Sequence, residues 1–210
     1  MKTYYDTNLN LPCTEMALQM KGYPSDETIL ASIGVYPITN IFPVYDKDTQ
    51  DIEPEEIVVN HENHTAIQNF KIVDCNPIIL QANLERVKNE KHKEALTKAD
   101  ESVSAYLSQY SDIEQLTFPQ QQKEVEAYLL DSTSSTPSLD EIAENRGVPR
   151  LELIQKAISK VQLFTAMSAK IVGQQQKYED MITSIINSST LTLVEKIQQI
   201  REINIVYQVA

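Results

Sequence analysis

The longest regular pattern of apolar positions lies in residues 149–187, which contain no proline after Pro149. Its large apolar side chains recur at the spacing that places them on one face of an α-helix. They are Leu151, Ile154, Ile158, Val161, Phe164, Ile171, Tyr178, Ile182 and Ile185. At a rise of about 1.5 Å per residue, such a helix would measure about 55 Å. We therefore expect a helix that spans a helical bundle or projects from one to meet a partner.

The same kind of pattern predicts four further helices. They cover residues 78–109, 119–131, 138–146 and 192–204. The first has a charged middle with a narrow apolar stripe, which is typical of a helix that is solvated over most of its surface. Pro119 suits the first turn of the second helix. Ser138 with Glu141 forms a capping-box pattern for the third, and Thr192 with Glu195 forms one for the fourth.

The segment before these helices carries the pattern of β-strands. Val35–Asp46 is rich in β-forming residues, but its two prolines remove hydrogen-bond donors and favour a place at a sheet edge or bulge. Ile57–Asn60 and Thr65–Val73 have the pattern of two hairpin arms. Ser25 as N-cap and Gly34 as stop predict a short helix over residues 25–33. We predict an antiparallel β meander with this helix on one face.

The turn Asn76-Pro77 is the predicted boundary between two domains. Residues 1–75 would form an N-terminal mixed β domain, and residues 76–210 a helical bundle with long helices. The predicted fold class is therefore α+β.

The composition of the chain limits the classes of function that it can have. A formal net charge of −12 over 210 residues favours solubility and repels nucleic acid unless a basic patch exists. No window of apolar residues is long enough for a transmembrane helix, and the N-terminus lacks the apolar region of a signal peptide. Cys13 and Cys75 lie far apart without a motif, which favours buried or half-buried free thiols in a reducing cytoplasm.

Few residues could bind a phosphate or a metal ion. The four glycines are scattered, which excludes a glycine-rich phosphate loop. His61 and His64 flank Glu62 and could contact a metal ion, but a solvent-facing hairpin turn is the preferred interpretation because no second cluster completes a site. His92 is expected on the surface of the charged helix.

The acidic stretch Asp46–Glu56 begins with the spacing of a calcium loop. Its sixth position is Asp51 instead of glycine, and its twelfth is Ile57 instead of glutamate, so a solvated turn is the better interpretation. With three histidines, two of them in one tetrapeptide, no Ser-His-Asp set can be assigned. We therefore predict no catalytic, cofactor-binding or metal-binding residues, and no enzyme activity.

Residues 137–158 have the order of a helix-turn-helix, with a short capped helix, a turn at Gly147 and a second helix. The first helix carries Asp140, Glu141 and Glu144, and the second continues well beyond the length of a recognition helix. Phosphate contacts would be few. An αα-corner within a bundle is therefore the preferred interpretation, and a DNA-binding regulator is a distant alternative.

Two segments resemble sequences of tailed bacteriophages. Leu30–Glu53, with the sequence LASIGVYPITNIFPVYDKDTQDIE, resembles a region near the start of small phage tail-module proteins. Leu116–Asp180, which contains LTFPQQQKEVEAYLLD and GQQQKYED, resembles the helical C-terminal region of tail fibre assembly proteins, or tail assembly chaperones. The family has tryptophan where this chain has Tyr128, a departure that keeps an aromatic side chain for packing.

This resemblance implies an accessory protein of a phage or phage-like tail, without cofactor, that binds the tail fibre and assists its folding, trimerisation or attachment. It would act in the host cytoplasm during assembly, bind neither nucleic acid nor membrane, and could form a homo-oligomer. A structural virion component at the fibre tip or baseplate is the alternative. Ala166, Met167, Lys170 and Gln174–Gln176 would either line the partner surface or pack against the helix at 119–131.

Overall fold

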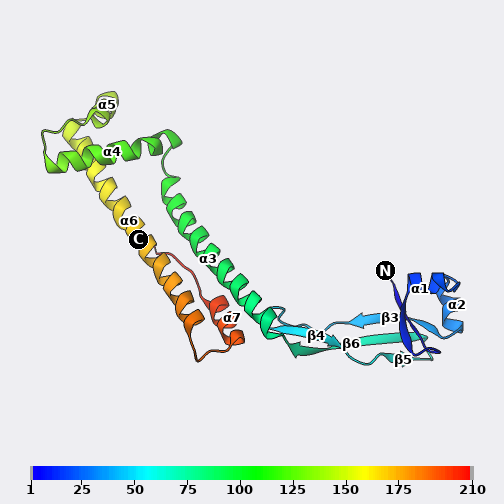
Figure 1. Cartoon of the computed structure of the whole chain (residues 1–210). Coiled ribbons are helices and arrows are strands. Elements are labelled where there is room, and N and C mark those ends of the chain that lie inside the picture. Colours follow the sequence, from blue (N-terminus) through cyan, green and yellow to red (C-terminus); the bar gives the residue numbers. More distant parts are fainter. Residues whose placement is uncertain (1, 209–210) are drawn as a thin grey trace. The chain divides into compact units, whose positions relative to one another are not determined.

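The computed structural model describes residues 2–208 and confirms the predicted α+β class (Figure 1). A six-stranded sheet with two short helices is followed by long helices. The chain divides into two compact units, Met1–Asn83 and Leu84–Ala210. The division falls inside the first long helix and not at the turn before it. The start of that helix is tied to the β unit, where the Asn83 amide donates to the carbonyl of Asp48 at 3.0 Å.

The β unit consists of six strands and two helices of six residues each. The strands are β1 (Thr3–Asp6), β2 (Leu11–Thr14), β3 (Val35–Ile41), β4 (Gln50–Pro54), β5 (Val58–Asn60) and β6 (Thr65–Asp74). The helices are α1 (Glu15–Met20) and α2 (Glu27–Ser32). The strand order is β2-β1-β3-β6-β4, and β5 also pairs with β6.

Strand β6 organises this sheet because it pairs with three other strands. Its first half pairs with β5 in antiparallel and with β3 in parallel orientation, and its second half pairs with β4 in antiparallel orientation. The predicted hairpin around residues 61–64 is confirmed. The parallel β3–β6 pair differs from the predicted meander, because residues 42–49 lead the chain on to β4 beside the second half of β6. Pro37 lies just before the β3–β6 ladder, which begins at Ile38.

The core of the β unit lies on both faces of β1. Because successive side chains of a strand point to opposite faces, Tyr4 and Tyr5 enter two different clusters. Tyr4 packs with Leu18 of α1 and Leu30 of α2, so α2 covers one face as predicted. Tyr5 packs on the other face with Tyr36 of β3 and with Ala66 of β6.

Asp26, and not the predicted Ser25, is the N-cap of α2. Its Oδ1 accepts hydrogen bonds from the N–H groups of Thr28 at 2.8 Å and Ile29 at 3.3 Å. These hydrogen bonds stabilise the carboxylate and lower the pKa of Asp26.

Replacing Gly34 with alanine is expected to destabilise the β unit by about 2 kcal/mol, because two costs add. Gly34 has a φ of +86°, and a Cβ there would lie 2.6 Å from the Thr7 hydroxyl oxygen. Gly22 has a similar φ of +79° with nothing within 4 Å of a Cβ. The matched Gly22→Ala variant should therefore lose only about 1 kcal/mol. Urea unfolding checks both, and equal losses would contradict the steric argument.

The helical unit contains the remaining helices, apart from the first turns of α3. They are α3 (Pro77–Leu107), α4 (Asp112–Leu130), α5 (Pro137–Arg146), α6 (Arg150–Asn187) and α7 (Leu193–Glu202). Helix α4 begins before the predicted residue 119, because the Ser111 hydroxyl accepts from the Glu114 N–H at 3.3 Å and caps an earlier turn. Pro119 consequently lies inside α4 rather than in its first turn. None of the helices within residues 2–208 is apolar over a length that could cross a bilayer.

The observed helix caps agree only in part with those predicted from the sequence. The capping box of Thr192 and Glu195 is confirmed at the start of α7. Gly147 ends α5 in the left-handed conformation that glycine adopts readily. The predicted box of Ser138 and Glu141 is wrong, since α5 begins at Pro137, and the side chain of its cap residue, Thr136, accepts no hydrogen bond from the N–H groups of the first turn.

Most of the predicted apolar face of α6 is turned inward. Ile154, Ile171 and Ile182 are buried. Leu151 is instead exposed, and Leu153 takes a place in the core. The buried positions change along the helix because its N-terminal part packs with α4 and α5, whereas Met167 and Ile171 pack with Ala99 of α3.

Candidate functional site

His61 and His64 are exposed at the turn between β5 and β6, as predicted, and both contact Tyr36. The Tyr36 hydroxyl lies 3.2 Å from Nδ1 of His61, and the Tyr36 ring meets the edge of His64 at a centroid distance of 5.4 Å. Residues 2–208 contain no group of three His, Cys, Asp or Glu side chains arranged to hold a metal ion. Cys75 is buried and Cys13 is half-buried, and both are free thiols, as predicted. Burial raises the pKa of both thiols.

A buried carboxylate of α4 binds the first N–H groups of α5 and so takes the place of a side-chain cap from the residue before that helix. Glu124 of α4 is 4% exposed, and its two oxygens accept from the N–H groups of Ser138 at 3.1 Å and Leu139 at 3.0 Å. The Gln120 amide donates a third hydrogen bond at 2.9 Å. Burial raises the pKa of Glu124, but these hydrogen bonds outweigh it and hold the pKa below its ordinary value. The charge also lies at the positive end of the α5 dipole.

A second polar network joins α5 to α6. Arg150 donates from Nε to Asp140 Oδ1 at 2.6 Å and from Nη2 to the Thr136 hydroxyl at 2.7 Å. The fully buried Thr136 in turn donates to Asp140 at 2.8 Å. With Leu139 and Ile154 in a shared apolar core, the two helices form the predicted αα-corner. The polar side chains of this corner serve its own packing.

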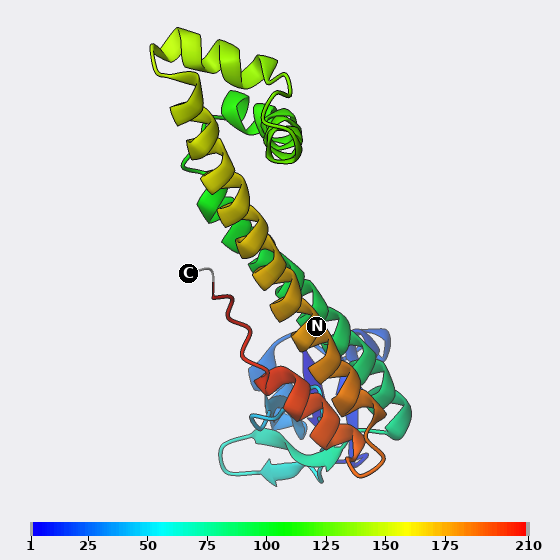
Figure 2. The same ribbon diagram turned by 90° about the vertical axis from the view of Figure 1, so that its left-hand side faces the viewer.

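An extended segment lies between α3 and α6, and we call residues Ile203–Gln208 the strap. Figures 1 and 2 show it leaving α7 and running alongside α6. The predicted helix at 192–204 ends at Glu202, and the strap follows without helical structure. Its alternate side chains Ile203, Ile205 and Tyr207 face inward, and the first two are buried.

Both neighbouring helices hold the strap by its main chain. From α3, Lys91 donates to the carbonyl of Ile203 at 3.2 Å, and Lys98 to that of Ile205 at 3.0 Å. From α6, the Tyr178 hydroxyl bonds both the N–H and the carbonyl of Val206. The Gln174 amide makes a pair of bonds to the main chain of Gln208, at 2.9 and 3.1 Å. The two helices therefore form a groove whose polar side chains recognise an extended main chain.

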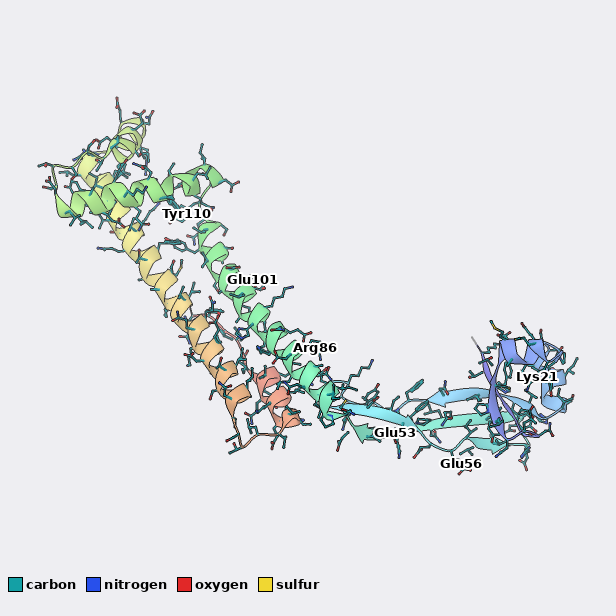
Figure 3. All side chains as sticks on the ribbon, viewed as in Figure 1. Lys21, Glu53, Glu56, Arg86, Glu101 and Tyr110 are labelled. Carbon is teal, nitrogen blue, oxygen red and sulfur yellow. The ribbon has the colours of Figure 1, made fainter. Side chains whose placement is uncertain are left out.

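Two hollows continue this groove beyond the strap. The first, of about 640 Å³, has walls from the strap and from α3. They are Lys98, Glu101, Ser102, Ala105, Tyr106, Gln109, Ile205, Val206 and Tyr207. The second, of about 310 Å³, lies among α3, α4 and α6 and shares Tyr106 with the first. Glu101 and Tyr110, which line the first and second hollow respectively, are labelled in Figure 3.

Four aromatic rings line the second hollow, which we call the aromatic pocket. Tyr106 lies 5.9 Å from Phe164, and Tyr110 meets Phe118 edge-on at 5.1 Å. Lys160 Nζ lies 4.5 Å from the centre of the Tyr110 ring, within cation–π range. The hydrogen bond between the two tyrosine hydroxyls and burial raise the pKa of Tyr106 to about 12. The Tyr106 hydroxyl therefore stays protonated at neutral pH, and the pocket is an apolar site with polar edges.

The residues predicted to line a partner surface do not form one continuous surface. Met167 is buried and packs on Ala99 of α3, not on the helix at 119–131. Gln174 binds the strap, and Gln175 pairs with Glu179 of its own helix at 3.0 Å. The other predicted members, Ala166, Lys170 and Gln176, are exposed.

The exposed area of the chain is larger than its mass requires. The chain exposes 13682 Å², whereas a compact monomer of 23.8 kDa would expose about 9,900 Å². Counting the two units as separate compact domains raises this expectation only to about 11,800 Å². The remaining difference, about 1,900 Å², exceeds the area that one chain contributes to a standard protein–protein interface.

Comparisons with known proteins assign no activity to this site. No family model and no solved structure matches the chain with significance. A protein of Haemophilus influenzae, described only as "Uncharacterized protein", is 38% identical over 58 residues. The match covers 28% of this chain and 85% of that protein, so the two are related over this stretch.

Proposed function

We propose that this chain is a non-enzymatic accessory protein of a bacteriophage tail or a phage-like particle, and that its helical unit binds the tail fibre. The observation that carries the proposal is the groove between α3 and α6, which already holds an extended segment and continues into the aromatic pocket. The resemblance of residues 30–53 and 116–180 to tail-module and fibre assembly proteins supplies the class of partner. Lys91 and Lys98 of this groove bind the main chain of the strap and pair with Glu94, which favours a binding role.

The physical reason for such a helper lies in the assembly of fibres. Subunits of a fibre expose apolar surface and unpaired strands before they associate, and such surfaces aggregate. A helical partner with an apolar groove can cover an extended segment until the subunits meet. The helper would in this way assist folding, trimerisation or attachment, without a cofactor.

A structural component of the virion, at the fibre tip or baseplate, is the second candidate. The large exposed area favours it, because a permanent component of an assembly covers such area with its neighbours. The exposed side chains of Ile113 and Leu116, three residues apart on α4, would belong to a covered face.

Quantitative mass spectrometry of purified particles separates the two candidates. An assembly helper should be absent, or present far below the copy number of the fibre, whereas a structural component should appear at a fixed ratio to it. Absence from particles, together with a failure to bind the fibre in extracts of producing cells, would refute both.

A further inference from the structure

The hollows beyond the strap and the strap itself form one path along α3. The strap runs from Lys91 toward Tyr106, and Ile205, Val206 and Tyr207 form the near wall of the first hollow. Tyr106 lines both the first hollow and the aromatic pocket. An extended segment lying along α3 next to Ile205–Tyr207 would therefore occupy the first hollow and then meet the aromatic pocket.

We propose that this path receives an extended segment of another polypeptide, with large apolar side chains at alternate positions and an aromatic residue for the aromatic pocket. The strap provides the main evidence for this occupant, because α3, which lines the path, already binds with α6 an extended chain that has Ile203, Ile205 and Tyr207 at alternate positions. The inference rests on the proposed function, since it names the kind of segment that the helical unit would take from its partner.

The length of the path suits such a segment. From Lys98 to its last residue, Leu107, α3 advances by about 14 Å. An extended chain covers that distance with about four residues. Two or three of its side chains would then point into the groove, and the last could fill the aromatic pocket of about 310 Å³.

The walls of the path also offer polar groups for a main chain. Within residues 2–208, Glu101 and Gln109 make no side-chain hydrogen bond or ion pair. A carboxylate can accept from N–H groups, and an amide can both donate and accept. Gln174 and Lys98 bind the main chain of the strap. Glu101 and Gln109 could bind the main chain of a second segment in the same way. The hollow therefore has the two features of the occupied groove, apolar walls and polar contacts for main-chain groups.

The test uses the full chain and a fluorescein-labelled hexapeptide with the strap sequence, Ile-Asn-Ile-Val-Tyr-Gln. Ala105 is an exposed residue of α3 that lines the first hollow, so Ala105→Arg blocks the path without disturbing the core. Ser104→Arg is the matched control, because Ser104 is exposed on the same helix outside the lining residues. Fluorescence anisotropy should give saturable binding to the wild type and to Ser104→Arg. Ala105→Arg should bind about tenfold more weakly.

A second measurement locates the peptide independently of any variant. A photo-reactive phenylalanine analogue in place of the peptide tyrosine should cross-link to residues 98–110, or to α4 and α6 around the aromatic pocket. A dissociation constant above about 1 mM, equal binding by the two arginine variants, or cross-links elsewhere would overturn the proposal. So would self-association of the wild-type chain that Ala105→Arg abolishes, since the occupant would then be a second copy.

The peptide-binding test contains no tail component, so its result can be told apart from a test of the proposed function. If the chain binds the fibre but not the peptide, this inference fails while the proposed function stands. If the peptide binds but the chain neither binds a fibre nor occurs in particles, the groove is a peptide site that serves another partner.

Discussion

Glu124→Ala is expected to lower the free energy of unfolding of the helical unit by about 3 kcal/mol. The substitution leaves the N–H groups of Ser138 and Leu139 without their acceptor, and Leu139 is itself 1% exposed. Hydrogen bonds to an ionised group are the strong ones, and a buried donor left unpaired costs its full desolvation. Urea unfolding followed by circular dichroism at the helical wavelength measures the loss.

The matched control for this variant is Glu126→Ala. Glu126 lies on the same helix and accepts one exposed hydrogen bond from Gln122 at 2.8 Å. Its loss should change the stability by less than about 0.5 kcal/mol. Equal effects of the two variants would contradict the assignment of Glu124 as the cap of α5.

The contribution of Glu124 should also depend on pH. Its pKa in the folded chain lies below that of an unfolded glutamate, which is about 4.3. The stabilisation is therefore fully present above about pH 4.3 and is lost as the pH falls through the folded pKa. The difference in stability between the wild type and Glu124→Gln should shrink at low pH, and a difference that grows there would contradict this account.

Ile205→Ala is the second substitution with a large expected effect, about 3 kcal/mol. Ile205 is 1% exposed, so its truncation leaves a cavity at the centre of the strap. The neighbouring Val206 is 56% exposed, while its main chain bonds the Tyr178 hydroxyl on both sides. Val206→Ala keeps those bonds and should cost less than about 0.5 kcal/mol.

Thermal and urea unfolding of the full-length variants check this pair. Amide exchange at Val206 and Gln208 adds a local readout, because both N–H groups are bonded to α6 side chains. Ile205→Ala should speed exchange there, and Val206→Ala should not. Slow exchange in both variants with unchanged stability would show that the strap does not depend on Ile205.

The parts of the fold that follow from local pattern could be predicted from the sequence. The helix at 149–187 and the capping box at Thr192 need only residues that are neighbours along the chain. Pairings between distant segments could not be predicted in the same way. The residues of β3 do not indicate that it pairs in parallel with β6 (Thr65–Asp74). The pairing depends on the path of the chain between the two strands, which no local pattern reveals.

For the same reason, most of the candidate site could not be predicted from the sequence. Glu124 caps a helix that begins thirteen residues later, so no local capping motif reveals it. The alternation of Ile203, Ile205 and Tyr207 was the one available signal of an extended strap, but a helix pattern continuous with α7 obscured it. The aromatic pocket gathers Tyr106, Phe118 and Phe164 from three helices.

Co-expression with the fibre protein of the same particle tests most directly the claim that the helical unit serves to bind another polypeptide. We predict that the chain co-purifies with the fibre, that Ala105→Arg weakens this association, and that Ser104→Arg leaves it intact. Soluble, trimeric fibre recovered equally well without the chain, and no association between the two proteins, would contradict it.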